Sequence, residues 1–165
     1  MSITIFDVID ALYFILPAYC ANAAPMIFGG GRPIDAGKNL SNGKPILGSH
    51  KTYRGFFFGL FIGTLVGFVL SALFPYNAML GFMLSLGALT GDLTKSFIKR
   101  RLDLPPGSSL PIADQLDFVI GALLFSLPVS PPPLLIVLII IIITPPIHLL
   151  TNFFAYLVGM KKSPW

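Results

Sequence analysis

The chain alternates long apolar stretches with short polar segments, and this pattern predicts several membrane-spanning helices. A helix needs roughly 17 to 25 mostly apolar residues to cross the hydrocarbon core of a bilayer. Five stretches approach this length: 3–28, 55–74, 78–98, 112–129 and 134–160. The stretch 55–74 carries no charge. Pro145 and Pro146 interrupt the last stretch and predict a kink there.

The composition agrees with a membrane location. Of the 165 residues, 55% are hydrophobic and 11% are charged, and the mean hydropathy is +0.82. So few charges cannot cover the surface of a soluble domain, whereas a helix can face lipid because its backbone hydrogen bonds are internal. The sequence therefore predicts an all-α integral membrane protein, a bundle of five transmembrane helices that forms one domain over residues 1–165.

The basic residues predict the orientation of these helices. Lysine and arginine near the ends of spans collect on the cytoplasmic side of a membrane. All eleven basic residues lie in 29–54, in 95–101 or at the C-terminus, and the links 75–77 and 130–133 contain none. This distribution predicts an N-terminus outside, a C-terminus in the cytoplasm, and cytoplasmic loops at about 29–54 and 99–111.

Charged residues inside the predicted spans mark the candidate site, because a charge at membrane depth is costly and usually functional. Four polar residues spaced i, i+3, i+4 and i+7 share one face of the third span: Asp92, Lys95, Ser96 and Lys99. Asp114 and Asp117 share a face at the start of the fourth span. Two spans joined by a short loop are antiparallel neighbours, so the three carboxylates should converge.

Three carboxylates beside many cations indicate a Mg²⁺ site next to a region that binds phosphates, with Asp92, Asp114 and Asp117 as metal ligands. Other interpretations of single residues stay open. Asp114 could be a helix N-cap, and Asp117 could favour the positive end of that helix. Asp92 could form an ion pair within its own helix, with Lys95 or Lys99.

The loop 29–54 mixes glycines with basic and amide side chains. Its backbone amides and cations suit a triphosphate, but it contains no GxxxxGK[ST] motif, and basic loops commonly serve only topology. His50 and His148 stand apart from other potential ligands, so neither is assigned to a metal. We expect His148 to pack after the double proline.

These motifs resemble the signature of the CTP-dependent phosphatidate cytidylyltransferases. That family carries a Gly-Asp, a Ser-x-x-Lys-Arg and a later Asp-x-x-Asp that opens a helix, and this chain has GDLTKSFIKRR and ADQLDF. The segments AYCANAAP and GKPILGSHKTYRG, and the chain length, resemble the short archaeal branch of the family. The likeness runs from about Ala18 to Leu123. Two features depart from the family pattern: His-Gly-Gly is missing before the paired aspartates, and Gln115 replaces an arginine.

The resemblance implies a Mg²⁺-dependent transfer of CMP from CTP to an unsaturated archaetidic acid, an isoprenoid ether lipid phosphate, with release of pyrophosphate. It nominates as catalytic Asp92, Lys99, Asp114 and Asp117, of which the three aspartates would hold the metal. The residues expected to bind CTP and the lipid phosphate are Lys44, Lys51, Thr52, Arg54, Ser96, Lys99 and Arg100. The active site would lie on the cytoplasmic face of the cell membrane, with the lipid tails in the bilayer and no nucleic acid as partner.

Three alternative functions remain at this point. A CTP-dependent lipid kinase would transfer the terminal phosphoryl group to an alcohol, and its products would distinguish it. A CDP-alcohol phosphotransferase would require the pattern DGxxAR…GxxxDxxxD, which the chain lacks. A small ion or phosphate transporter would need acidic residues along a path across the bilayer, whereas all but Asp7 and Asp10 lie near the predicted cytoplasmic face.

Overall fold

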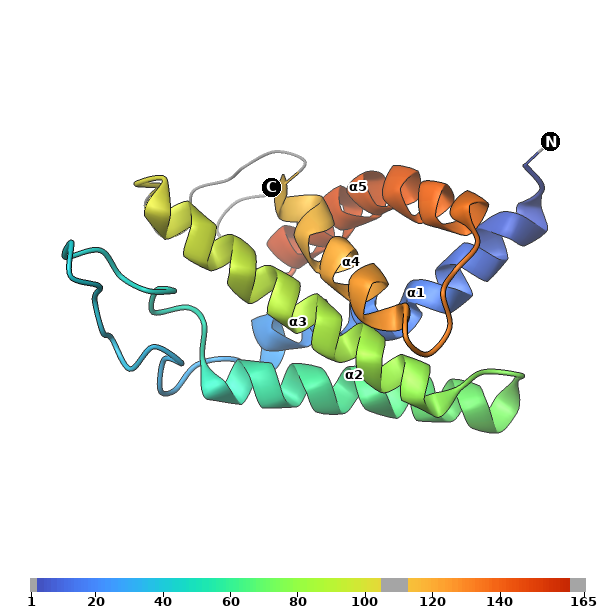
Figure 1. Ribbon diagram of the computed structural model, residues 1–165, viewed down its shortest axis with the longest axis horizontal. Helices are drawn as coiled ribbons and strands as arrows, with labels where there is room; N and C mark the ends of the chain where they lie inside the picture. The colour runs from blue at the N-terminus through green and yellow to red at the C-terminus, as the bar shows by residue number, and fades with distance from the viewer. Residues whose placement is uncertain (1–2, 105–112, 161–165) are drawn as a thin grey trace.

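The protein is an assembly of helices in every part of the chain that the computed structural model describes, residues 3–104 and 113–160. The helices are α1 (Ile5–Phe28), α2 (Tyr53–Leu73), α3 (Ala78–Arg101), α4 (Ala113–Ser126) and α5 (Leu134–Leu157), as Figure 1 shows. Within the described ranges, β pairing is limited to two isolated bridges, Pro33 with Thr52 and Asn39 with Pro45. The all-α prediction is therefore confirmed, and each helix coincides closely with one predicted apolar stretch.

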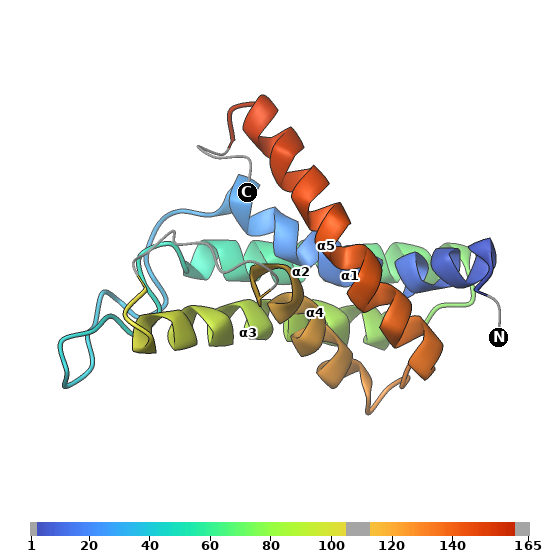
Figure 2. The ribbon, with the colours of Figure 1, turned by 90° about the horizontal axis from the view of Figure 1, so that it is seen from above.

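Three helices, α1, α2 and α5, are long and apolar enough to cross a membrane. The other two differ for physical reasons, since α3 ends in the basic residues Lys99, Arg100 and Arg101, and α4 has only 14 residues. The last helix continues through Pro145 and Pro146 and ends at Leu157, before the predicted end at residue 160 (Figure 2). Residues 105–111 of the predicted cytoplasmic loop, and Lys161 and Lys162, lie outside the described residues.

Glycines at every fourth position of α2 explain how closely the first three helices pack. The buried residues on this face are Gly55, Gly59, Gly63 and Gly67. A Cβ added to Gly63 would lie 2.7 Å from the backbone oxygen of Pro17 in α1. One added to Gly67 would lie 2.5 Å from the Cα of Gly81 in α3. The backbone of α2 therefore touches the backbones of both neighbours, a mode of packing typical of helices in membranes.

The helices α3 and α4 also approach each other through glycines. A Cβ on Gly87 would lie 2.4 Å from the backbone oxygen of Gly121, and one on Gly91 would lie 2.4 Å from that of Asp117. No side chain separates the two helices at these points. The residues that follow Gly91 in α3 are therefore held beside the first turns of α4.

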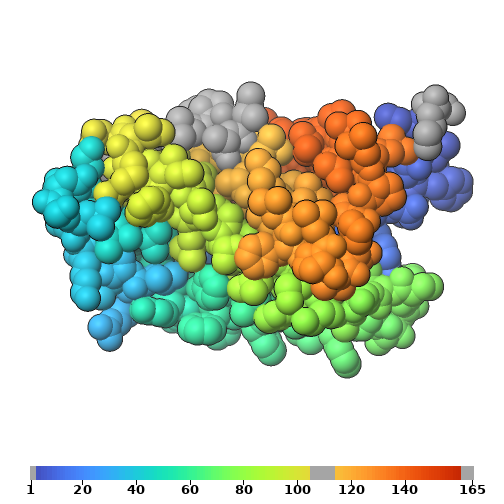
Figure 3. Space-filling view, in the orientation of Figure 1, coloured from blue at the N-terminus to red at the C-terminus, as the bar shows by residue number. Residues whose placement is uncertain are grey.

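The loop 29–52 packs against the C-terminal end of α3, at the end of the molecule opposite the start of α1 (Figures 1 and 3). The Arg101 guanidinium donates a hydrogen bond to the Pro45 carbonyl oxygen, and the Lys44 ammonium lies 2.6 Å from Asp103. The base of the loop is closed by the Ile34 amide, which donates to the Lys51 carbonyl oxygen at 2.8 Å. These contacts fix where the segment that carries Lys51 enters α2.

Asp35 organises the interior of this loop. Its carboxylate accepts hydrogen bonds from the backbone amides of Gly37 at 3.0 Å and of Leu47 and Gly48 at 2.9 Å each. Burial raises the pKa of Asp35, but the three hydrogen bonds outweigh burial and hold the pKa below its ordinary value. The ionised carboxylate therefore ties together loop segments that are more than ten residues apart in sequence.

Replacing Gly67 with alanine should destabilise the protein by about 1–3 kcal/mol, because the added methyl group must push α2 and α3 apart. Thermal unfolding in detergent, followed by circular dichroism, measures the effect. The control is Val69→Ala on the exposed face of the same helix, which should unfold near the wild-type temperature. An unchanged unfolding temperature for Gly67→Ala would contradict the backbone contact.

Replacing Asp35 with asparagine should lower the free energy of opening the loop by about 1–3 kcal/mol. The amide nitrogen of asparagine cannot accept a hydrogen bond, so at least one backbone donor of the loop is left unsatisfied. Hydrogen exchange should accelerate at Leu47 and Gly48, whereas Asp10→Asn, an exposed change on α1, should leave it unaltered. In the wild type this stabilisation should be complete above the ordinary pKa and should be lost as the pH falls through the lowered folded-state pKa. Equal exchange in both variants would show that Asp35 does not hold the loop.

Candidate active site

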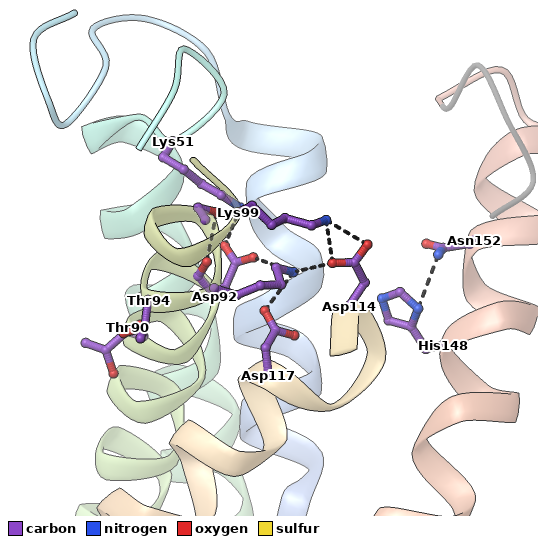
Figure 4. A network of polar contacts seen from close by, with 11 residues as sticks. Lys51, Thr90, Asp92, Thr94, Lys99, Asp114, Asp117, His148 and Asn152 are labelled. Carbon is purple, nitrogen blue, oxygen red and sulfur yellow. Dashed lines mark hydrogen bonds and ion pairs between the residues drawn. The ribbon is translucent and has the colours of Figure 1, made fainter. Parts of the chain in front are cut away.

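Three aspartates from two helices surround one ammonium group. The Lys95 Nζ lies 3.3 Å from Asp92 Oδ1, 3.5 Å from Asp114 Oδ1 and 2.7 Å from Asp117 Oδ2. Asp92 and Lys95 come from α3. Asp114 and Asp117, which Figure 4 labels together with Asp92, come from the first turns of α4. The spacing in the sequence predicted this convergence of carboxylates, and the glycine crossing of α3 and α4 produces it.

Two further lysines contact the same carboxylates from outside the centre. The Lys51 ammonium, at the end of the loop 29–52, lies 2.5 Å from Asp92 Oδ2. The Lys99 ammonium donates to both oxygens of Asp114, at 2.6 and 2.9 Å. The candidate site is therefore an alternating arrangement of negative and positive groups, built from one loop and two helices.

The alternative interpretations of single residues account for only part of this arrangement. Asp92 does pair with Lys95 within α3, but the same ammonium also contacts Asp114 and Asp117 on another helix. Lys99 contacts Asp114 of α4. Asp114 lies inside the first turn of α4, which begins at Ala113, so it is not the N-cap residue, and its carboxylate contacts Lys95 and Lys99.

The cluster is largely buried, and one of its oxygens is poorly satisfied. The side chain of Asp117 is 8% exposed, and that of Lys95 is 18% exposed. The contact between Lys95 and Asp117 Oδ2 is an ion pair without hydrogen-bond geometry, so that oxygen has no hydrogen-bond partner among the described residues. Burying a carboxylate oxygen in this state is costly, and the Lys95 ammonium beside it offsets its charge.

The donor set fits a hard divalent cation, because three carboxylates converge and Mg²⁺ prefers oxygen ligands. As the side chains stand, no three His, Cys, Asp or Glu groups in residues 3–104 and 113–160 have the spacing of a metal site. The Lys95 ammonium instead occupies the centre between the three carboxylates.

Three of the other predicted residues each follow a lysine of the cluster in the sequence, and two of them, Thr52 and Ser96, have structural partners. The Thr52 hydroxyl accepts a hydrogen bond from the Gly55 amide at 3.1 Å and caps the start of α2. The Ser96 hydroxyl donates to the backbone oxygen of Asp92 at 2.9 Å. Arg100 is buried, with 7% of its surface exposed.

Two predicted substrate-binding residues do not reach the cluster. Lys44 pairs with Asp103, whose side chain is 73% exposed, at the outer edge of the loop. Arg54 is exposed and its guanidinium lies 5.9 Å from the centre of the Phe58 ring. Both residues were predicted to bind substrate because they lie in the basic loop. Which basic side chains of the loop face the carboxylate cluster depends on how the loop folds.

A cavity of about 950 Å³ borders the cluster and extends between α1 and α5. Lys51 and Asp92 line its charged side, and Asn22, His148 and Asn152 line it elsewhere. His148 was expected only to pack, but its Nδ1 lies 3.2 Å from Asn152 Nδ2 on the cavity wall. One signal in the sequence could have revealed this wall, since Thr144, His148 and Asn152 are spaced i, i+4 and i+8 along an otherwise apolar helix.

A family model described as CarS-like CDP-archaeol synthase matches residues 3–165. The chain belongs to this family. The CDP-archaeol synthase of Pyrococcus horikoshii is 50% identical over 166 residues, which cover 96% of this chain and 98% of that protein. That of Methanocaldococcus jannaschii is 46% identical, over 94% of this chain and 96% of the relative. The family resemblance in the motifs is confirmed, and the match extends beyond Leu123 through the last helix.

A solved structure shares the fold of this CDP-archaeol synthase family member. It is described as an intramembrane enzyme for archaeal membrane lipids biosynthesis. The two chains superpose with a TM-score of 0.82 at 35% sequence identity, over 88% of this chain and 94% of the other. This similarity, together with the three apolar helices, places the chain among membrane proteins.

Proposed function

We propose that this chain is a cytidylyltransferase that joins CTP to an unsaturated archaetidic acid, forming CDP-archaeol and pyrophosphate. The observation that carries the proposal is the cluster of three aspartates and three lysines at the edge of a cavity of about 950 Å³. Such a cluster suits two reactants that both carry phosphates. Membership of the CDP-archaeol synthase family supports the choice of cytidylyl transfer over phosphorylation or transport.

In the proposed reaction, a phosphate oxygen of the lipid attacks the α-phosphorus of CTP. The bond between that phosphorus and the oxygen bridging to the β-phosphate breaks, and pyrophosphate leaves with the electron pair. A phosphate monoester is already largely ionised near neutral pH, because its second pKa is about 6. The attacking oxygen therefore requires no general base, which agrees with a cluster made of carboxylates and ammonium groups.

The protein's main task is to bring two polyanions together and hold them in line. Lys51 and Lys99 flank the carboxylates and are positioned to neutralise phosphate oxygens. Asp92, Asp114 and Asp117 would hold Mg²⁺, which when bound neutralises charge on the triphosphate. The amide and imidazole groups of Asn22, His148 and Asn152 offer hydrogen bonds to the substrates along the cavity wall.

The proposed arrangement in the membrane has five spans, with the N-terminus outside and the C-terminus in the cytoplasm. Two observations support it. The loop 29–52 and the C-terminal end of α3, which are rich in lysine and arginine, lie together at one end of the molecule (Figure 1). The links 74–77 and 127–133 contain no charged residue. The cluster would then open toward the cytoplasm, where CTP is found, while the lipid tails remain in the bilayer.

An assay with labelled CTP tests the reaction. Purified protein in detergent, given Mg²⁺ and the unsaturated ether lipid phosphate, should move label from the α-phosphate of CTP into the lipid. Pyrophosphate should be released in equal amount. Label from the γ-phosphate in the lipid would instead indicate a kinase, and no product of either kind would overturn the proposed function.

Asp92→Asn and Asp117→Asn should each lower turnover by at least about a hundredfold, because each removes a charge that the proposed metal site requires. Both proteins should retain the helical circular dichroism of the wild type. Asp103→Asn is the matched control, since it removes an exposed carboxylate that pairs only at the edge of the loop. Full activity in the first two variants would exclude the metal assignment.

Cysteine labelling tests the orientation. In a Cys20→Ser background, a cysteine at Ser41 in the loop 29–52 should react with an impermeant maleimide only after the cells are opened. A cysteine at Ser130, between α4 and α5, should react in intact cells. The reverse pattern would invert the proposed topology, and labelling of both positions in intact cells would contradict it.

A further inference from the structure

Lys95 occupies an unusual position for a lysine. Its ammonium group lies within 3.5 Å of carboxylate oxygens from three different aspartates on two helices. Lys51 and Lys99 instead contact the carboxylates from the outside of the cluster. Lys95 is therefore at the centre of the negative charge, where carboxylates that converge in this way would place a cation.

A permanent ion pair does not explain this geometry well. The shortest contact, to Asp117 Oδ2, is 2.7 Å long but lacks hydrogen-bond geometry, so a largely buried carboxylate oxygen remains without a hydrogen-bond partner in the described residues. A lasting structural ion pair in a buried site is expected to satisfy its polar atoms, because unsatisfied charged groups are costly. The other two contacts of Lys95, 3.3 Å to Asp92 Oδ1 and 3.5 Å to Asp114 Oδ1, are longer than the N···O distance of a strong hydrogen bond.

We propose that Lys95 is an internal counter-ion that holds the three carboxylates in the metal-free protein and gives up its place when a divalent cation binds. A lysine suits this role because its charge sits on a flexible chain that can reorient, in contrast to the planar fork of arginine. The inference rests on the proposed function insofar as Asp92, Asp114 and Asp117 are the metal ligands. Lys95 is accordingly a positioning residue.

The displaced ammonium has an evident destination. Lys51 and Asp92 line the cavity, so the cluster borders the space assigned to the substrates. A divalent cation would compensate the carboxylates, and the freed ammonium could then pair with phosphate oxygens there. The positive charge that a divalent cation adds to the site would then be offset by the phosphates of the substrates.

The experiment measures Mn²⁺ binding by electron paramagnetic resonance on purified protein in detergent, without CTP or lipid. In Lys95→Met, Mn²⁺ should bind on the order of tenfold or more tightly than in the wild type, because the competing ammonium is gone. Lys99→Met is the matched control, since it removes an equal charge that contacts the cluster at Asp114. It reports the general effect of losing a nearby positive charge.

A larger gain in affinity for Lys95→Met than for Lys99→Met supports the exchange. An equal or smaller gain overturns it, because Lys95 would then act only through its general charge. Lys95→Arg, which keeps the charge, should bind Mn²⁺ no more tightly than the wild type. Lys95→Gln gives the same comparison if Lys95→Met does not fold.

A second readout is thermal unfolding, measured first without metal and then with it. In the presence of EDTA, Lys95→Met should unfold at a lower temperature than the wild type, and added Mn²⁺ should restore most of the loss. A separate cytidylyl-transfer assay on the wild type keeps the two proposals apart. An inactive wild type with the expected order of Mn²⁺ affinities would overturn the proposed function and leave the role of Lys95 intact.

Discussion

The close approach of α3 and α4 is the constraint on which the candidate site depends. At Gly87, Gly91 and Gly121 the two backbones meet with no room for a Cβ atom. This contact fixes the distance between the helices more strictly than interdigitated side chains would, because backbone atoms cannot change rotamer. The carboxylates of α4 are thereby delivered to the face of α3 that carries Asp92 and Lys95.

The sequence was most informative where function and membrane physics impose simple periodicities. The uncharged stretch 55–74 could be predicted as a helix from its length alone, and α2 covers all of it except Phe74. Asp92 and Lys99 could be placed on one helical face by counting residues, and the i, i+3 spacing of Asp114 and Asp117 defined the opposing face. Both predictions use only the local geometry of a helix, which the surrounding fold changes little.

Other features could not be predicted because they depend on contacts between distant segments. Asp35 looks like any loop aspartate until the amides of Leu47 and Gly48 fold back onto it. Lys51 faces the cluster while Arg54, three residues later, lies against Phe58. His148 was assigned to packing, since its place on the cavity wall arises only when α5 lies beside α1.

The pairing of charges in the cluster also affects the cost of inserting the protein into the membrane. Within the described residues, its ion pairs join three carboxylates, Asp92, Asp114 and Asp117, to three ammonium groups, Lys51, Lys95 and Lys99. A newly synthesised chain must bring these groups into or beside the bilayer before it has captured any ligand. Because the charges sum to zero, the nascent bundle avoids the penalty of inserting an unbalanced group of anions. The ion-paired charges of the cluster thus balance one another without any charge supplied by a ligand.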